Sequence, residues 1–116
     1  HQAGDEAIRE VSRVLRENLR ATDIAGRYGG EEFGVILGNT DAEGAIIFCE
    51  RVRKEVEAIT VVHDKQEIKF TVSLGISLAT NETSDYKTWL EQSDQALYAA
   101  KEGGRNQTVV FKQTAG

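Results

Sequence analysis

Two consecutive glycines, Gly29 and Gly30, separate two apolar runs and are followed at once by two acids, Glu31 and Glu32. Because glycine accepts positive φ without a Cβ clash, a glycine pair between strand-like runs is typical of a tight β-hairpin. Successive side chains of a strand point to opposite faces, so the two carboxylates can serve different purposes. On these residues alone, a solvated turn with charged side chains is the more common explanation. The sequence predicts a hairpin here, and a ligand site only if more of the chain supports it.

Helical and strand periodicities divide the rest of the chain into short elements. The clearest strand pattern is 68–78, in which apolar and polar residues alternate without a break. Capping residues and glycines mark the ends of three helical segments. The predicted helices are 5–20, a second opening at 40–43 and reaching 59, and a third capped at 83–85 and ending at 103–104. The predicted strands are 24–29, 33–37, 60–63, 68–78 and 108–111.

The composition fits one small globular domain. The chain has 116 residues, of which 40% are hydrophobic, and a net charge of -5. An acidic balance argues against a nucleic-acid binder, because such proteins carry a basic face. The single cysteine, Cys49, falls on an apolar helix face and is expected to be a buried free thiol. With no apolar run long enough for a membrane span, these features fit a reducing, cytoplasmic setting. A membrane anchor in a region before residue 1 stays open.

The string Arg27–Leu37 resembles the signature of the GGDEF family in its GGEEF spelling. Further segments match family motifs in the same order: 1–6 resembles GHxxGDE, 20–23 resembles RxxD, and 94–101 with 104–106 resembles DxALYxAK and GRN. The resemblance covers nearly the whole chain. It implies that 1–116 is a single GGDEF domain of a diguanylate cyclase, a nucleotidyltransferase that condenses two GTP to cyclic di-GMP and two pyrophosphates.

The resemblance also implies an α+β fold, the ferredoxin-like βαββαβ arrangement of GGDEF and nucleotide-cyclase domains with a mainly antiparallel sheet. The predicted order of this chain, αββα(β)βαβ, lacks the first strand of that arrangement. We therefore interpret 1–116 as a domain truncated at its N-terminus. The lost strand would lie between 33–37 and 68–78, so we expect a gap there unless a neighbouring chain or a preceding segment fills it.

The catalytic roles implied by the resemblance fall on the signature. Glu31 is the expected metal ligand and the group that accepts the proton of the attacking ribose 3′-hydroxyl, and Glu32 is expected to support the same metal site. Gly29 and Gly30 would let the nucleotide approach bare backbone. Asp5 would accept from the N–H groups of guanine, although an acid at a helix start is also explained by the helix dipole.

Two more groups of residues resemble family ligand contacts. Lys101 and Arg105 match the family's phosphate-contacting pair, although a lysine in a last helical turn is favourable without any ligand. Arg20 and Asp23 match the inhibitory site for cyclic di-GMP, where they suit the acceptors and donors of a guanine edge. Arg51 on the second helix is a candidate second arm of that site. Without the motif, Arg20 and Asp23 would be a surface ion pair worth at most about 1 kcal/mol.

The implied cofactor is Mg²⁺ or Mn²⁺. The implied partners are GTP, cyclic di-GMP, a second copy of the domain for catalysis, and an N-terminal sensory or regulatory domain. The family's metal-binding aspartate precedes residue 1, and Mg²⁺ requires near-octahedral coordination, so we expect residues 1–116 alone to be inactive or nearly so. Two alternatives stay open: a non-catalytic receptor that binds cyclic di-GMP and, with less support, a cyclase that makes another product.

Overall fold

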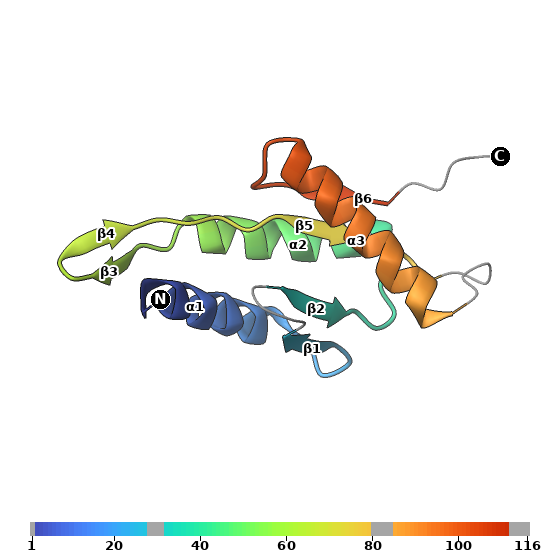
Figure 1. Cartoon of the computed structure of the whole chain (residues 1–116). Helices are drawn as coiled ribbons and strands as arrows, with labels where there is room; N and C mark the ends of the chain where they lie inside the picture. Colours follow the sequence, from blue (N-terminus) through green and yellow to red (C-terminus); the bar gives the residue numbers. More distant parts are fainter. Residues whose placement is uncertain (1, 28–31, 80–84, 112–116) are drawn as a thin grey trace.

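The computed structural model describes residues 2–27, 32–79 and 85–111, which form three helices and six short strands (Figure 1). The helices are α1 (Gln2–Asn18), α2 (Ala42–Glu57) and α3 (Tyr86–Glu102). The strands are β1 (Ile24–Arg27), β2 (Phe33–Ile36), β3 (Val61–His63), β4 (Gln66–Ile68), β5 (Leu74–Ile76) and β6 (Thr108–Val110). The molecule is elongated, 53 × 32 × 24 Å, and the β3–β4 hairpin projects from one end (Figure 1).

Two of the helices begin where the sequence places capping aspartates. Asp41 precedes α2 and Asp85 precedes α3, and each side chain accepts a hydrogen bond of 2.8 Å from a backbone N–H of the first turn. Such a bond satisfies one of the free donors at a helix start. The first helix was predicted over 5–20, whereas α1 runs from Gln2 to Asn18. None of the helices in the described ranges has the length and apolar character needed to cross a membrane.

The strands form three separate two-stranded sheets. β1 and β2 pair antiparallel, with Gly26 opposite Gly34, and β3 and β4 form a second antiparallel pair. β5 and β6 pair in parallel, with Gly75 opposite Val109. Within residues 2–27, 32–79 and 85–111, no strand joins β2 to β5. The continuous sheet that would have contradicted the expected gap is therefore not formed by these residues.

The prediction of one strand over 68–78 is wrong. The segment splits into β4, which ends at Ile68, and β5, which covers Leu74–Ile76. Phe70 and Val72, between the two strands, still pack against the core, so the alternation of the sequence is realised as burial. Hydrophobic periodicity reports which side chains face the interior and does not by itself require a hydrogen-bonded partner strand.

The core is centred on α2, whose apolar face packs against α1 and the β5–β6 sheet. The predicted face of this helix is confirmed, including the buried free thiol of Cys49. Burial raises the pKa of this thiol to about 12, with a smaller contribution from the nearby Glu50 carboxylate. The buried core residues are Val14, Leu15, Ala45, Phe48, Cys49, Val52, Val56 and Ile76.

Helix α3 packs on β5 with almost no space between the two backbones. A Cβ atom added to Gly75 would collide with backbone atoms of Ser93 and Leu97 on α3. Overpacking of this kind displaces whole elements, so glycine is required at this crossing. Helix α3 therefore lies across the β5–β6 sheet (Figure 1).

Candidate functional site

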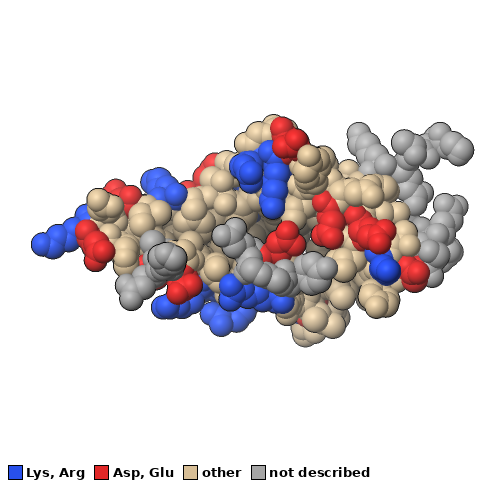
Figure 2. Space-filling model, viewed as in Figure 1, with Lys and Arg blue, Asp and Glu red and all other residues tan. Residues whose placement is uncertain are grey.

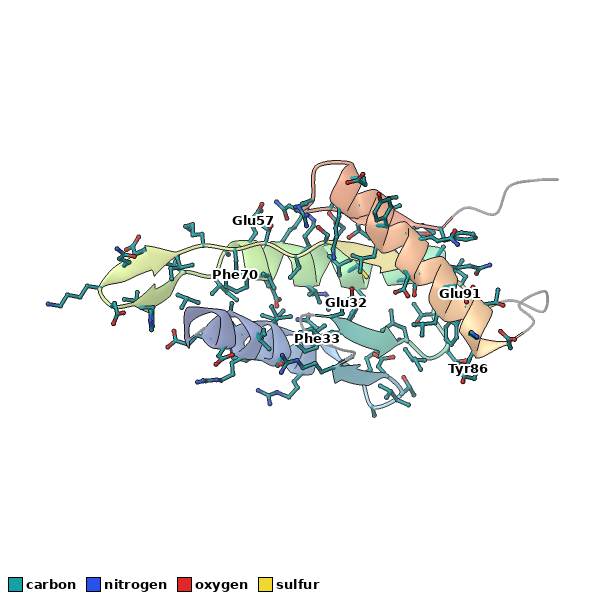
Figure 3. All side chains as sticks on the ribbon, in the orientation of Figure 1. Glu32, Phe33, Glu57, Phe70, Tyr86 and Glu91 are labelled. Carbon is teal, nitrogen blue, oxygen red and sulfur yellow. The ribbon has the colours of Figure 1, made fainter. Side chains whose placement is uncertain are left out.

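The β1–β2 hairpin carries the glycine and acid signature. Residues 28–31 lie outside the described part of the chain, so Gly29, Gly30 and Glu31 are not placed and their predicted roles stay predictions. Glu32 is half-buried and lies next to Phe33 where β2 begins (Figure 3). Phe33 packs against the core and anchors this end of β2. The structure therefore positions one acid of the signature at the start of a strand held by the interior.

Asp5 lies in the first turn of α1 and is exposed. An acidic side chain at this position is favourable to the helix dipole whether or not a ligand is present. Its predicted contact with guanine stays a prediction.

Two cations lie at the C-terminal end of α3, one in its last turn and one in the turn that follows. Lys101 lies in the last turn of the helix, and Arg105 is exposed three residues beyond the helix end. The Arg105 backbone N–H donates to Ala100 O at 2.9 Å, and Arg105 has a φ of 64°. In the described part of the chain, neither Lys101 nor Arg105 has a carboxylate partner. Two unpaired cations on a fixed backbone are suited to an anion.

Asn106 closes this turn, and sequence reasoning assigned it no role. Its backbone is also left-handed, with a φ of 47°, a conformation that asparagine tolerates better than most residues. Its backbone N–H donates to Ser73 Oγ at 3.1 Å, its Oδ1 accepts from Arg53 Nη1 at 3.1 Å, and its Nδ2 donates to Glu57 Oε2. The signal in the sequence was an asparagine directly after Gly103–Arg105, where a chain must turn back from a helix.

Arg53 on α2 is held by Glu50. Its Nε and Nη2 each donate to one Glu50 oxygen at 2.8 Å, and Glu50 also accepts from Thr108 Oγ1 at 2.9 Å. The hydrogen bond from Arg53 is the main cause that lowers the pKa of Glu50 to about 2; burial opposes it, and the Thr108 hydroxyl and the charges of Arg53 and Lys54 add smaller lowering effects. These side chains line a hollow of about 380 Å³ between α2 and β6. The Arg53 guanidinium that lines this hollow is already paired with Glu50.

Arg20 and Asp23 form a second pair, at the end of α1. Arg20 Nε donates to Asp23 Oδ2 at 3.0 Å and Arg20 Nη2 to Asp23 Oδ1 at 2.9 Å. The backbone N–H groups of Arg20 and Gly38 also donate to Asp23, so each carboxylate oxygen accepts two hydrogen bonds. Arg20 Nη2 reaches Gly38 O at 2.9 Å and Thr40 Oγ1 at 2.6 Å. Sequence reasoning did not anticipate the contributions of Gly38 and Thr40.

The environment of Asp23 is set mainly by Arg20. The side-chain and backbone hydrogen bonds from Arg20, with a smaller one from Gly38, lower the pKa of Asp23 to about 2. The Asp23 side chain is 0% exposed, whereas the Arg20 side chain that covers it is 54% exposed. Only the Arg20 side chain therefore separates Asp23 from solvent on that side. Guanine binding by this pair stays a prediction. Both Asp23 oxygens already accept hydrogen bonds from the protein. Among the described residues, Arg20 Nη1 has no acceptor, so it is the group that guanine would meet.

Arg51 lies on α2, two residues before Arg53, and is exposed. No ion pair involves it within the described ranges. On the face drawn in Figure 2, acidic and basic side chains both occur over most of the molecule. An anionic ligand would therefore depend on individual cations such as Arg51 rather than on a broad basic surface.

The described residues do not assemble a metal site. No group of three histidine, cysteine or acidic side chains in residues 2–27, 32–79 and 85–111 is arranged to hold an ion. Glu32 alone does not fit Mg²⁺, which prefers near-octahedral oxygen coordination. The metal roles of Glu31 and Glu32 stay predictions.

The family model described as "Diguanylate cyclase, GGDEF domain" matches residues 1–107. Diguanylate cyclase A of Treponema denticola is 40% identical over 112 residues, which are 97% of this chain and 30% of that protein. This chain thus spans less than a third of the length of that curated relative.

Solved GGDEF domains have the same fold. The GGDEF domain of DgcB from Caulobacter crescentus in complex with c-di-GMP superposes with a TM-score of 0.92 and 32% identity, over 97% of this chain and 67% of that chain. The active GGEEF domain of a diguanylate cyclase from Vibrio cholerae gives 0.87 and 30%, over 98% and 72%. The predicted α+β GGDEF fold is confirmed.

Proposed function

Because the chain belongs to the GGDEF family of diguanylate cyclase domains, we propose that it binds GTP and, in a dimer of the full-length protein, joins two GTP into cyclic di-GMP. In each half of the reaction, a ribose 3′-oxygen bonds to the α-phosphorus of the other GTP while the bond to pyrophosphate breaks. Two such steps give one cyclic di-GMP and two pyrophosphates. Glu31 would accept the proton of each 3′-hydroxyl.

The structural observation that supports this proposal is the pair of cations at the C-terminal end of α3. Lys101 and Arg105 have no carboxylate partner in the described ranges, which also holds for other cations such as Arg51, but these two lie at one helix end, in the last turn and just beyond it. The turn that carries Arg105 is fixed by hydrogen bonds from Gly103 N and Arg105 N to the last turns of α3. A triphosphate would pair with both cations, which have no partner among the described residues.

The implied Mg²⁺ or Mn²⁺ would be held by Glu31 and Glu32 with further oxygen ligands. When bound, the ion would offset phosphate charge.

The test uses the full-length protein with GTP labelled at the α-phosphate and Mg²⁺. We expect labelled cyclic di-GMP and unlabelled pyrophosphate to form. The double variant Lys101→Ala, Arg105→Ala should raise KM for GTP about 100-fold, since two charge-assisted contacts are lost. Lys54→Ala is the matched control, an exposed lysine on α2. Absence of both products from the full-length protein would overturn the cyclase.

We also propose that residues 1–116 on their own are inactive or nearly so. β2 and β5 each pair with one strand and are not joined to each other by a described strand. An additional strand between them would complete the central sheet that positions the nucleotide. The comparison is between 1–116 and the full-length protein in the same assay, and equal turnover would contradict the proposal.

The second candidate is a receptor for cyclic di-GMP, and the Arg20–Asp23 pair favours it. This pair holds an exposed guanidinium in a fixed position at the end of α1. As a product-inhibition site it serves the cyclase as well, with Arg51 as second arm. The receptor is supported if the full-length protein binds cyclic di-GMP in a manner that Arg20→Ala abolishes while GTP gives no product.

A further inference from the structure

We propose that Asn106 is the positioning residue of the phosphate-contacting turn, and that Arg53 and Glu57 of α2 set its position. The proposal rests on the role assigned above to Lys101 and Arg105. Neither α2 residue is part of the predicted nucleotide site. Their effect on GTP would pass through the side-chain amide of Asn106.

The turn needs an external restraint because its backbone is unfavourable. Gly104, Arg105 and Asn106 have φ angles of 118°, 64° and 47°, so three consecutive residues are left-handed. For a residue other than glycine, this conformation costs about 1–2 kcal/mol. Such a backbone persists where its surroundings hold it.

Asn106 supplies that restraint from three directions. Its backbone N–H is tied to Ser73, just before β5, at 3.1 Å. Its side-chain oxygen accepts from Arg53 at 3.1 Å, and its side-chain nitrogen donates to Glu57, one turn further along α2. Each polar atom of the amide therefore meets a group of the matching kind on one helix. Arg53 and Glu57 fix both the position and the orientation of the amide.

The hydrogen bonds between Arg53 and Glu50 fix the direction from which Arg53 reaches Asn106. Glu50 fixes the Arg53 guanidinium through its Nε and Nη2, which leaves Nη1 to bind Asn106. The Arg53 side chain is 15% exposed, so its position is set by these protein contacts and not by contact with solvent. Arg105 precedes Asn106 directly, and a change of backbone at Asn106 would redirect the Arg105 side chain.

The first experiment measures GTP kinetics of the full-length Asn106→Gly variant. Glycine keeps the left-handed backbone but removes the amide. We expect KM to rise about tenfold, equivalent to about 1.4 kcal/mol, with kcat changed less than about twofold. The affinity for guanosine should stay unchanged, because Asp5, the residue predicted to contact guanine, lies on α1 and outside the turn. Amide exchange at Arg105, whose N–H bonds to Ala100, should accelerate.

Asn18→Ala is the matched control. Asn18 Nδ2 donates to Glu55 of α2 at 2.9 Å, so this change removes another asparagine bridge to the same helix at a distance from the turn. We expect it to lower stability without raising KM for GTP. An equal rise of KM in both variants, or none in Asn106→Gly, would overturn the proposal.

An exchange of donor and acceptor tests whether Glu57 is the partner of Asn106. Asn106→Asp keeps the acceptor for Arg53 but sets a carboxylate against Glu57, and adding Glu57→Gln restores a donor. We expect the single change to raise KM and the double change to bring it back within about threefold of wild type. No recovery in the double variant would show that Glu57 does not act through Asn106.

Tripolyphosphate binding separates this proposal from the cyclase itself. If the full-length protein forms no cyclic di-GMP but Asn106→Gly still weakens tripolyphosphate binding, the cyclase fails and the positioning role stands. If the wild type is active and the variant keeps its affinity, the positioning role fails alone. Absence of both activity and tripolyphosphate binding in the wild type overturns both.

Discussion

Two arginine–carboxylate pairs in this domain have the same spacing and opposite burial. Arg20–Asp23 and Glu50–Arg53 both join residues three apart, and in each the arginine uses Nε and Nη2 on the two carboxylate oxygens. In the first, the arginine is 54% exposed and the carboxylate 0% exposed. In the second, the arginine is 15% exposed and the carboxylate 32%. Both arginines also donate to further protein groups, but Arg20 leaves more than half of its side chain open to solvent, whereas Arg53 is largely enclosed.

The largest expected effect breaks the first pair. Arg20→Ala should raise the concentration of cyclic di-GMP needed for half-inhibition of the full-length protein about 100-fold, because a charged contact with guanine is worth about 1–3 kcal/mol. Arg53→Ala should change it less than about threefold. Equal effects of the two variants on inhibition would show that burial does not separate the roles of these pairs.

The second prediction concerns stability and breaks the other pair. Arg53→Ala should lower the free energy of unfolding by about 2 kcal/mol, because Glu50 and Asn106 both lose a charged donor. Arg51→Ala, two residues earlier on an exposed position of α2, should change it by less than about 0.5 kcal/mol. Urea denaturation of the two variants measures the difference, and a smaller loss in Arg53→Ala than in Arg51→Ala would contradict it.

The third prediction is a pH dependence shared by both pairs. The pKa values of Asp23 and Glu50 are each lowered to about 2, so the folded state binds these protons less readily than the unfolded chain. Their stabilisation is complete above the unfolded pKa of about 4 and is lost as the pH falls toward 2. Urea midpoints measured from pH 7 to pH 2 should drop in that window. Asp23→Asn and Glu50→Gln should each make the drop shallower.

The smallest effect sharpens the account of Arg20. Thr40→Val removes the hydroxyl that accepts from Arg20 Nη2 at 2.6 Å, while the Asp23 contacts stay. Because Arg20 Nη2 keeps Asp23 Oδ1 and Gly38 O as acceptors, we expect a loss of only about 1 kcal/mol, so cyclic di-GMP affinity should weaken about fivefold. Calorimetric titration measures it. A loss as large as that of Arg20→Ala would mean that Thr40, not Asp23, holds the arginine.

The sequence predicted the helices, their caps and the α2 face because these depend on local pattern. It failed at 68–78, since alternation marks burial and cannot show that β4 and β5 separate. It named Arg20 and Asp23 through a motif but not Thr40, which lies 20 residues from Arg20 and meets it only in the folded chain. For the same reason Asn106 went without a role, because its partners lie 33 to 53 residues away.

The glycine at the crossing of β5 and α3 has a consequence for how the domain tolerates change. Because the backbone of β5 contacts the backbone of α3 at Gly75, the position of α3 along the strand does not depend on the size of a side chain at this contact. Lys101 lies four residues beyond Leu97, about 6 Å along the helix axis from that contact. Side chains elsewhere in the interior can therefore be exchanged while the distance from β5 to Lys101, the lysine that we propose contacts phosphate, stays nearly the same.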